Sequence, residues 1–244
     1  MPLVSLLIAT CNRLHFSKKY IPQIISRIGN ISTDVLIWDN ASNDGTLDWL
    51  WEYKKINPII RKVLYSDENI GMEAYNYLAN KTESKYIIKV DDDIEVPTDF
   101  VKRMVHAYET VKDNKLAYLG WDMFWTAGSS FATRSGLGLY IGNKGTIVQV
   151  SPKDRVLIHN YPAKFMVNGV CRLSLRNTFL ELGGHPKGIR YGVDSYVSKR
   201  AETAGYKIGY LNSVDLIRHH GNDTDPTYKQ FKKEELSQAN KCEK

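Results

Sequence analysis

The chain contains, at residues 86–93, the stretch Tyr86-Ile87-Ile88-Lys89-Val90-Asp91-Asp92-Asp93, in which three consecutive carboxylates follow a short apolar run. The run is rich in β-branched and aromatic residues, which predicts a short buried strand. Carboxylates gathered at the end of a strand repel one another, and a divalent cation with a preference for oxygen ligands relieves that repulsion. The triplet therefore indicates a metal site, although a solvated acidic loop explains the triplet alone equally well.

The composition is that of an ordinary globular protein. The chain has 244 residues, of which 43% are hydrophobic and 25% are charged, enough for one large domain or two small ones. The apolar stretches are too short for a membrane span, and the first residues lack the basic start of a signal peptide. We therefore expect a cytoplasmic protein with reduced cysteines. The spacing of the three cysteines matches no metal site.

The net charge of +6 is the second feature of the composition. A basic excess suits phosphorylated ligands or the anionic surface of a membrane, so peripheral membrane contact stays open, as does a simple solvated surface. Nucleic acid is not an expected partner, because no basic stripe is interleaved with aromatic residues. The late basic residues are Lys229, Lys232, Lys233, Lys241 and Lys244.

Segments with strand and helix patterns alternate strictly through the first half of the chain. Such alternation predicts an α/β fold with a parallel, doubly wound sheet. In these sheets, ligands bind outside the carboxyl ends of the strands. The predicted strands cover residues 3–9, 35–38, 61–65 and 86–90, and the predicted helices cover residues 16–28, a segment after residue 44, and residues 71–80.

Polar residues follow each of these four strands, and we expect them to form one shared site. For the second half of the chain, the pattern predicts a mixed α/β structure built onto the same sheet. The predicted helices cover residues 99–111, 176–182 and 194–204. A strand is predicted at residues 116–121 and a glycine-rich hairpin at residues 136–150. The four polar groups are Thr10-Cys11-Asn12-Arg13, Asp39-Asn40, Asp67-Glu68-Asn69 and Asp91-Asp92-Asp93.

Five motifs in a fixed order extend this picture over nearly the whole chain. They are residues 4–13, residues 38–46, Asn69-Ile70-Gly71 with Asn76, Asp91-Asp92-Asp93, and Gly183-Gly184 with Asp194, Arg200 and Gly205. Together they resemble glycosyltransferase family 2, whose members have the GT-A fold. The resemblance implies a mainly parallel, Rossmann-like sheet flanked by helices, with a mixed acceptor-side half.

The same resemblance implies a division of the chain. Residues 1–226 would form a single GT-A glycosyltransferase domain, with residues 1–97 as the nucleotide-sugar-binding half and residues 98–226 as the acceptor-side half. Residues 227–244 would be a polar C-terminal tail.

The implied reaction is the transfer of one sugar, with inversion, from a nucleotide diphosphate sugar of the UDP, GDP or dTDP type. The acceptor would be a hydroxyl of a glycan, glycolipid or glycoprotein. Asp39 would bind the nucleotide base. The other residues expected to contact the donor are Thr10, Asn12, Arg13, Asn69, Gly71, Asp91 and Asp92.

The resemblance also assigns a metal site and a base. Asp93, with Asp91, would hold Mn²⁺ or Mg²⁺ on the diphosphate, where a cation neutralises charge on the leaving group. One of His219 and His220 would reach the metal, and the sequence leaves open which one. Asp194 would take the proton from the attacking hydroxyl, although a residue at the start of a helix can also be a simple N-cap.

The chain departs from the pattern of the family at several positions. Ala9 and Cys11 replace the usual Pro and Tyr, Tyr75 stands where many members carry Arg, and Val193 precedes Asp194 in place of an acid. The Gln-x-x-Arg-Trp motif and membrane helices of processive synthases are missing from the sequence, which favours addition of a single sugar.

Aromatic residues around Gly128 could bind the acceptor or belong to the core, and the loop at residues 128–130 could form a lid over the donor. These aromatic residues are Trp121, Phe124, Trp125 and Phe131. Two other functions remain open: a non-catalytic protein that binds nucleotide sugars on a transferase fold, and a sugar-phosphate nucleotidyltransferase.

Overall fold

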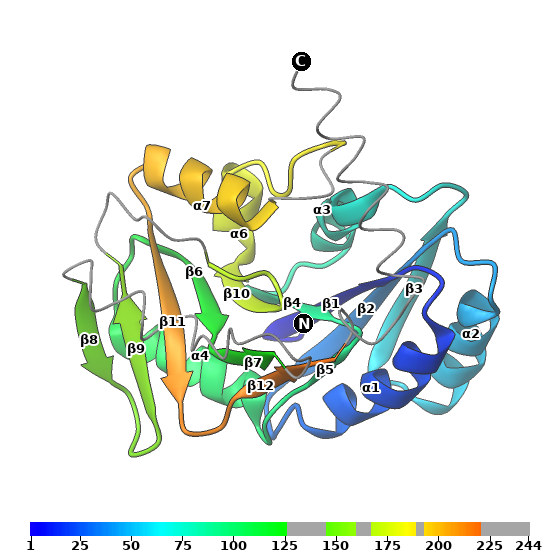
Figure 1. Ribbon diagram of the computed structural model, residues 1–244, viewed down its shortest axis with the longest axis horizontal. Coiled ribbons are helices and arrows are strands. Elements are labelled where there is room, and N and C mark those ends of the chain that lie inside the picture. Colours follow the sequence, from blue (N-terminus) through cyan, green and yellow to red (C-terminus); the bar gives the residue numbers. More distant parts are fainter. Residues whose placement is uncertain (126–144, 160–166, 189–192, 221–244) are drawn as a thin grey trace.

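The structure, a computed structural model, describes residues 1–125, 145–159, 167–188 and 193–220. Its main feature is a nine-stranded sheet with the strand order β3-β2-β1-β4-β10-β6-β11-β9-β8. Four strands from the first half, β1 (Val4–Thr10), β2 (Thr33–Asn40), β3 (Ile60–Ser66) and β4 (Tyr86–Asp91), pair in parallel (Figure 1). The predicted parallel α/β sheet is therefore confirmed.

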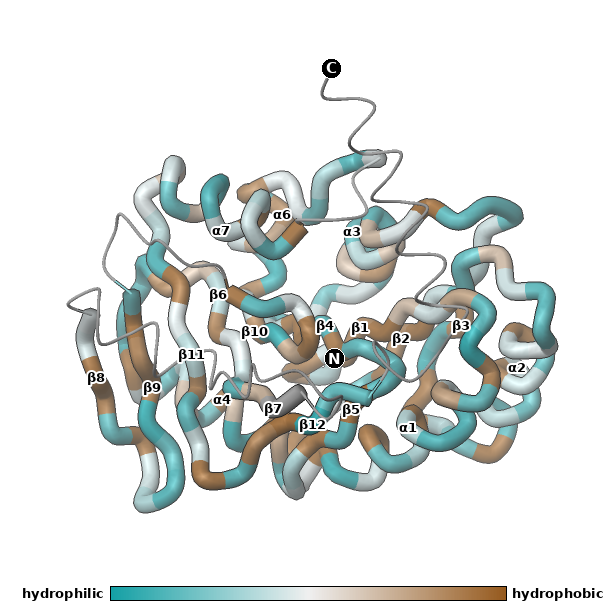
Figure 2. Tube along the Cα trace, viewed as in Figure 1, coloured by the Kyte–Doolittle hydropathy of each residue, from teal (hydrophilic) through white to brown (hydrophobic). Residues whose placement is uncertain are grey.

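Helices cover both faces of this sheet, which explains why the central strands are apolar on both sides. Figure 1 shows α1 (Leu14–Ser26), α2 (Thr46–Ile56) and α4 (Phe100–Val111) on one face. The opposite face carries α3 (Ala74–Asn80), preceded by the 3₁₀ helix η1 (Gly71–Glu73), together with α6 (Arg176–Glu181) and α7 (Val193–Thr203). Hydrophobic residues lie along β1 and β2, and most connecting segments are hydrophilic (Figure 2).

The second half completes the sheet with mixed pairing, as expected. The strand β10 (Cys171–Leu175) lies antiparallel between β4 and β6 (Leu116–Trp121). Next to β6 lies the parallel strand β11 (Lys207–Ser213), and β9 (Asp154–Ile158) and β8 (Thr146–Gln149) follow in antiparallel pairing. The sequence did not predict β10, because polar Arg172 and Ser174 interrupt its apolar residues although both are buried.

A small three-stranded sheet closes over the carboxyl end of β4. It consists of β5 (Ile94–Glu95), β12 (Ile217–His219) and β7 (Met123–Trp125). In this sheet His219 pairs with Ile94, the residue that follows the acid triplet. The pairing brings the end of the described chain back to Asp93.

Several expectations fall partly or wholly outside the described residues. They include most of the hairpin at residues 136–150, the loop at 128–130, Phe131, the side chains of Phe124 and Trp125, and the tail at 227–244. Within the described part, residues 146–149 pair with β9. Trp121 is fully buried and belongs to the core. None of the described helices is long and apolar enough to span a membrane.

Candidate active site

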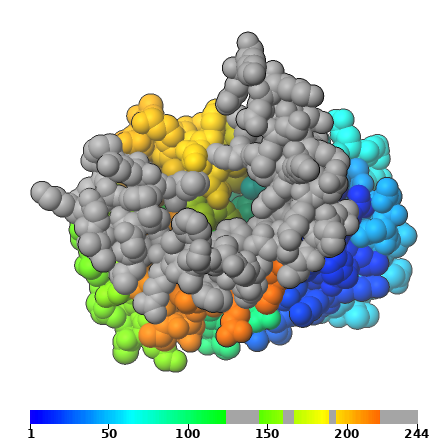
Figure 3. All heavy atoms as spheres, viewed as in Figure 1, coloured from blue at the N-terminus to red at the C-terminus, as the bar shows by residue number. Residues whose placement is uncertain are grey.

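The strand ends that the sequence singled out meet at one edge of the main sheet. The strand β1 lies between β2 and β4, with Thr10 beside Asp39 and Ala9 beside Asp91. Two strand spacings separate Asp39 from Asp91, which places their backbones about 10 Å apart. Figure 3 views the molecule from the same side as Figure 1, and atoms in the colours of the α3 and α6 region are visible in it.

The three consecutive acids have different partners. Asp91 is the last residue of β4, whereas Asp92 and Asp93 lie in the turn between β4 and β5. Asp91 accepts a hydrogen bond from the Lys89 ammonium. Asp92 is buried and accepts hydrogen bonds from the Ser17 hydroxyl at 3.1 Å and from Arg13 at 3.2 Å. The Asp92 carboxylate is thus hydrogen-bonded to residues at the start of α1. Its predicted contact with the donor stays a prediction.

Asp93 is the most strongly ionised of the three acids. Burial by itself disfavours its charge, but His219 and Arg13 outweigh that effect and hold the pKa of Asp93 well below its usual range. Burial raises the pKa of Asp91 and of Asp92, which Lys89 and Arg13 partly offset. A carboxylate that stays charged while buried is suited to a cationic ligand.

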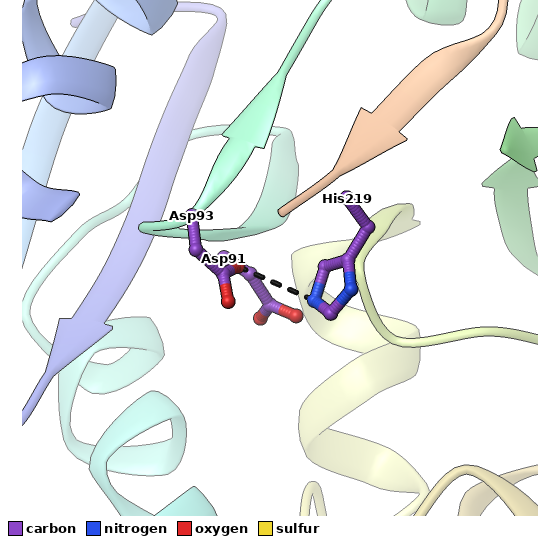
Figure 4. Close-up of side chains that lie close together, drawn as sticks. All are labelled: Asp91, Asp93 and His219. Atoms are coloured by element: carbon purple, nitrogen blue, oxygen red, sulfur yellow. Dashed lines mark ion pairs between the residues drawn. The ribbon is translucent and has the colours of Figure 1, made fainter. Parts of the chain in front are cut away.

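Asp91, Asp93 and His219 form a cluster of possible metal ligands (Figure 4). One ligand atom from each residue lies within 4.8 Å of the others, and His219 Nε2 is 3.3 Å from Asp93 Oδ1. Two carboxylates and one imidazole are a donor set that fits Mn²⁺, since carboxylates suit hard cations and imidazole suits transition metals. The residues present therefore fit the cation that the sequence indicated.

His220 has side-chain contacts outside this cluster. Its Nε2 lies 3.2 Å from a carboxylate oxygen of Glu95, and its ring stacks on Tyr20 at 5.0 Å between centroids. The backbone N–H of His220 donates to the Asp93 carbonyl at 3.0 Å. Of the two predicted histidines, the structure brings His219 to the acids.

Asp39 has the environment expected of a ligand-binding carboxylate. It is completely buried, and its Oδ1 accepts the backbone N–H of Ser42 at 2.9 Å. Its Oδ2 has no hydrogen-bond partner among the described residues. Burial raises the pKa of Asp39, although the hydrogen bonds from Ser42 act in the opposite direction. A buried polar atom without a partner calls for an external one, and a ligand N–H is a suitable donor.

Asn12 joins the loop after β1 to the loop after β2, which follows Asp39. It has a left-handed backbone with φ 51°. Its N–H donates to the Ser42 hydroxyl at 2.8 Å, and its Oδ1 accepts the N–H of Asn43 at 2.7 Å. Thr10 lies deeper, where its hydroxyl is 3.0 Å from that of Ser17. Both residues shape the site through protein contacts.

Asn69 and Gly71 dock the third loop onto the first two. Asn69 Oδ1 accepts the Gly71 N–H at 2.8 Å, and its amide nitrogen lies 3.4 Å from the Cys11 sulfur. Gly71 has φ 58°, and its carbonyl accepts a hydrogen bond from Asn40 at 3.2 Å. The glycine is needed because other residues rarely adopt that conformation.

Asp194, the predicted base, is the second residue of α7. Its Oδ2 accepts the backbone N–H of Gly169 at 2.8 Å, and its Oδ1 lies 3.5 Å from a guanidinium nitrogen of Arg172. The side chain is 31% exposed, so it is accessible as well as anchored. These contacts come from a different segment of the chain, which distinguishes Asp194 from a simple helix cap.

The remaining motif residues hold the loop after α6. Asn76 exchanges two hydrogen bonds with the backbone of His185, at 2.9 and 2.8 Å, and Arg200 donates to the Leu182 carbonyl at 2.6 Å. Gly184 has φ 60° and contacts Asn76 so closely that a Cβ would lie 2.2 Å from its amide oxygen. These residues fix the conformation of the loop after α6 through contacts with its backbone.

The sequence reasoning missed two charged residues beside the acids, Lys89 and Arg172. Both side chains are buried, and each contacts an acid of the site. A lysine in the middle of a continuous apolar strand is a signal that could have identified Lys89. Arg172 had no such signal, because its strand was not predicted.

The fold is of the GT-A type that the motifs indicated. The family model described as "Glycosyl transferase family 2" matches residues 5–119, which contain β1 to β6 and the acid triplet. The resemblance to this family that the motifs indicated is thereby confirmed over these residues. No curated protein matches the chain at a significant level.

Solved structures show the same fold at low sequence identity. A mannosyltransferase from Pyrobaculum calidifontis, in complex with GDP-Man and Mn²⁺, has a TM-score of 0.67 at 14% identity, covering 94% of this chain and 59% of its own. GalNAc-T7 with UDP, GalNAc and Mn²⁺ has a TM-score of 0.66 at 16% identity, with coverages of 90% and 44%. S. aureus TarS in complex with UDP-GlcNAc has a TM-score of 0.66 at 14% identity, with coverages of 91% and 59%. The chain thus spans about half of the length of these structures.

Proposed function

We propose that this chain is an inverting, metal-dependent glycosyltransferase that moves a single sugar from a nucleotide diphosphate sugar to an acceptor hydroxyl. The observation that carries the proposal is the cluster of Asp91, Asp93 and His219 at the same sheet edge as the buried carboxylate of Asp39. A cation site and a polar base-binding site on neighbouring strands suit the two ends of a nucleotide diphosphate.

Asp39 would bind the base of the nucleotide. Its Oδ2 is buried without a partner among the described residues, and it would accept a ring N–H of the base. Uracil, guanine and thymine all offer such an N–H, so UDP, GDP and dTDP sugars remain candidates. The three structural neighbours described above contain GDP-Man, UDP or UDP-GlcNAc, which supports a donor of this class. Residues 1–97 would form this donor half.

Asp91, Asp93 and His219 would hold Mn²⁺, with Mg²⁺ as the alternative. When bound, such a cation neutralises the negative charge that develops on the departing diphosphate. Arg13 would keep Asp93 ionised through its contact with the other carboxylate oxygen. The low pKa of Asp93 means that this ligand needs no deprotonation at neutral pH.

Asp194 would act as the general base. It comes from α7, in the acceptor-side half at residues 98–226, and its carboxylate is partly open to solvent. A base on the acceptor side can take the proton of a hydroxyl that attacks from opposite the leaving group, which produces inversion. The acceptor would be a glycan, glycolipid or glycoprotein, presented to a single domain at residues 1–226.

The experiment combines donor binding with turnover. Thermal unfolding is measured with UDP, GDP and dTDP, each with and without Mn²⁺, because a ligand that binds only the folded state raises the unfolding temperature. The sugar nucleotides of the best binder are then tested for hydrolysis and transfer. We expect Asp93→Asn and Asp194→Asn each to lower turnover at least 100-fold. The exposed control Asp48→Asn is expected to behave as the wild type.

The outcomes separate the candidate functions. Nucleotide binding without any turnover would favour a non-catalytic binding protein, and formation of a nucleotide sugar from a sugar phosphate would favour a nucleotidyltransferase. Turnover that survives in Asp93→Asn would overturn the metal assignment, and turnover that survives in Asp194→Asn would overturn the base.

A further inference from the structure

Two buried cations lie directly opposite each other beneath the candidate active site. Lys89 on β4 and Arg172 on β10 are paired residues of the antiparallel ladder, and their exposed fractions are 6% and 3%. Like charges directly opposite on a sheet destabilise it, and burial of an unpaired charge costs still more. An arrangement of this kind is stable only where each cation has an anionic partner.

The partners are the two acids that the proposed reaction uses. Lys89 donates to the Asp91 carboxylate, and Arg172 lies 3.5 Å from the Asp194 carboxylate. The two pairs are joined through one residue, because Lys89 also donates to the Gly169 carbonyl while the Gly169 N–H donates to Asp194 at 2.8 Å. A continuous path of contacts therefore links an acid of the metal cluster to the proposed base.

Gly169 fits this path only because it has no side chain. A Cβ at this position would lie 2.4 Å from Asp194 Oδ1, a separation that real Cβ atoms do not show. An alanine would therefore displace the Asp194 carboxylate or the loop before β10. The close approach ties the position of the carboxylate to the backbone of Gly169.

Arg172 is itself held in place on two sides. Its guanidinium lies over the ring of Tyr118, 4.9 Å from the centroid, and one nitrogen is 3.2 Å from His185 Nε2. Burial, together with the charges of Arg172 and Lys89, holds the pKa of His185 well below its usual range. The neutral imidazole can then accept a hydrogen bond from Arg172. Tyr118 and His185 thus fix the position of the guanidinium independently of Asp194.

We infer that Lys89, Gly169 and Arg172 form a positioning bridge that fixes the Asp194 carboxylate relative to the Asp91 end of the metal cluster. The inference rests on the proposed function and extends it, since the bridge joins the donor half of the chain to the acceptor half. A shift of about 1 Å in a reacting group can lower a rate on the order of 100-fold.

The test compares turnover with donor binding in variants of the bridge. Arg172→Met and Gly169→Ala are expected to lower kcat at least tenfold, while the Kd for the tightest-binding of UDP, GDP and dTDP, measured by calorimetry with Mn²⁺, stays within twofold. Arg172→Lys, which keeps a cation, is expected to recover part of the lost kcat. Ser174→Ala is the matched control, because Ser174 is a buried residue on the same face of β10.

Asp194→Asn is measured in the same series. Wild-type kcat in both Arg172→Met and Gly169→Ala, combined with an inactive Asp194→Asn, would overturn the bridge and leave the proposed base intact. An active Asp194→Asn would instead overturn the proposed base. Equal losses in Arg172→Lys and Arg172→Met, each with weakened nucleotide binding and a lowered unfolding temperature, would show a purely structural role and also overturn the bridge.

Discussion

At the scale of single residues, the site depends on how neighbouring acids are partnered. Asp91, Asp92 and Asp93 are adjacent in sequence, but Lys89, Ser17 and His219 contact them separately. Each environment gives its acid a different tendency to ionise, and the pKa of Asp93 alone is lowered. The end of β4 at Asp91 and the turn that follows it place the carboxylates of Asp91 and Asp93, rather than that of Asp92, close to His219.

Asp39→Asn tests the buried oxygen that lacks a partner. The amide can keep the hydrogen bond from Ser42 through its oxygen, but it places an NH₂ donor where the acceptor Oδ2 now lies. We expect the affinity for the preferred nucleotide diphosphate to fall at least tenfold, which corresponds to about 1.4 kcal/mol. Calorimetric titration measures the change, with Asp48→Asn as the control. Unchanged affinity would show that Asp39 does not contact the base.

His185 predicts a pH dependence of stability. Its pKa in the folded protein is well below the unfolded value near 6.5. Below about pH 6.5 the unfolded chain therefore binds the proton that the folded protein excludes, and stability falls as pH falls, by up to about 1.4 kcal/mol per pH unit. Above that pH both states are neutral, and the effect is absent.

The measurement is urea unfolding of the wild type and of His185→Gln between pH 5 and 8. The variant is expected to lose less free energy of unfolding between pH 7 and pH 5 than the wild type. Identical pH profiles for the two proteins would contradict the assignment of a neutral, buried His185.

At the scale of elements, short connections position the site more than the helices themselves do. The loop after α6 is held by Asn76 of α3 and by Arg200 of α7. The loop after β1 is joined to the loop after β2 through Asn12 and to the loop after β3 through Asn69. Each contact crosses between segments that are separate in sequence, so the loops stabilise one another.

Gly184→Ala tests one of these contacts. The position combines φ 60° with a Cβ that would lie 2.2 Å from Asn76 Oδ1. We expect a loss of about 2–4 kcal/mol in the free energy of unfolding, because backbone strain and a clash are added together. Gly205→Ala is the matched control, since Gly205 has φ 77° but no atom within 4 Å of the added Cβ.

The control should lose only the strain of the left-handed conformation, about 1 kcal/mol. Urea unfolding of the two variants gives the comparison. Equal losses in Gly184→Ala and Gly205→Ala would show that the contact with Asn76 relaxes without cost.

At the scale of the whole molecule, one sheet runs through both halves of the chain. The strand β10 pairs with β4 of the first half and with β6 of the second, and β12 returns to β5 beside the acid triplet. The cluster of possible metal ligands takes two residues from the first half and His219 from the end of the described chain. Site and sheet therefore depend on both halves being present.

Residues 1–97 expressed alone are predicted not to fold cooperatively. The fragment would leave the edge of β4 without β10, and the core on the α1 side without Phe100, Met104 and Val105. Circular dichroism during urea unfolding should show one sharp transition for the full chain and none for the fragment. A cooperative transition of the fragment would show that the donor half is an independent domain.

The sequence alone determined the four parallel strands, most helices and the gathering of acids at one edge. These features follow from local patterns, because apolar periodicity identifies strands and helices and the carboxyl ends of parallel strands lie together. The motifs also indicated the family, which the match over residues 5–119 confirms.

Only the tertiary structure decided which distant residues meet. The choice of His219 over His220 depends on the register of β12 with β5, and the meeting of Lys89 with Arg172 depends on the insertion of β10 between β4 and β6. The strand β10 could not be predicted because Arg172 and Ser174 are polar, and their burial depends on partners from elsewhere in the chain. Strand pairing over long separations in sequence leaves no periodic trace, since its energy comes from contacts that form only when the chain has folded.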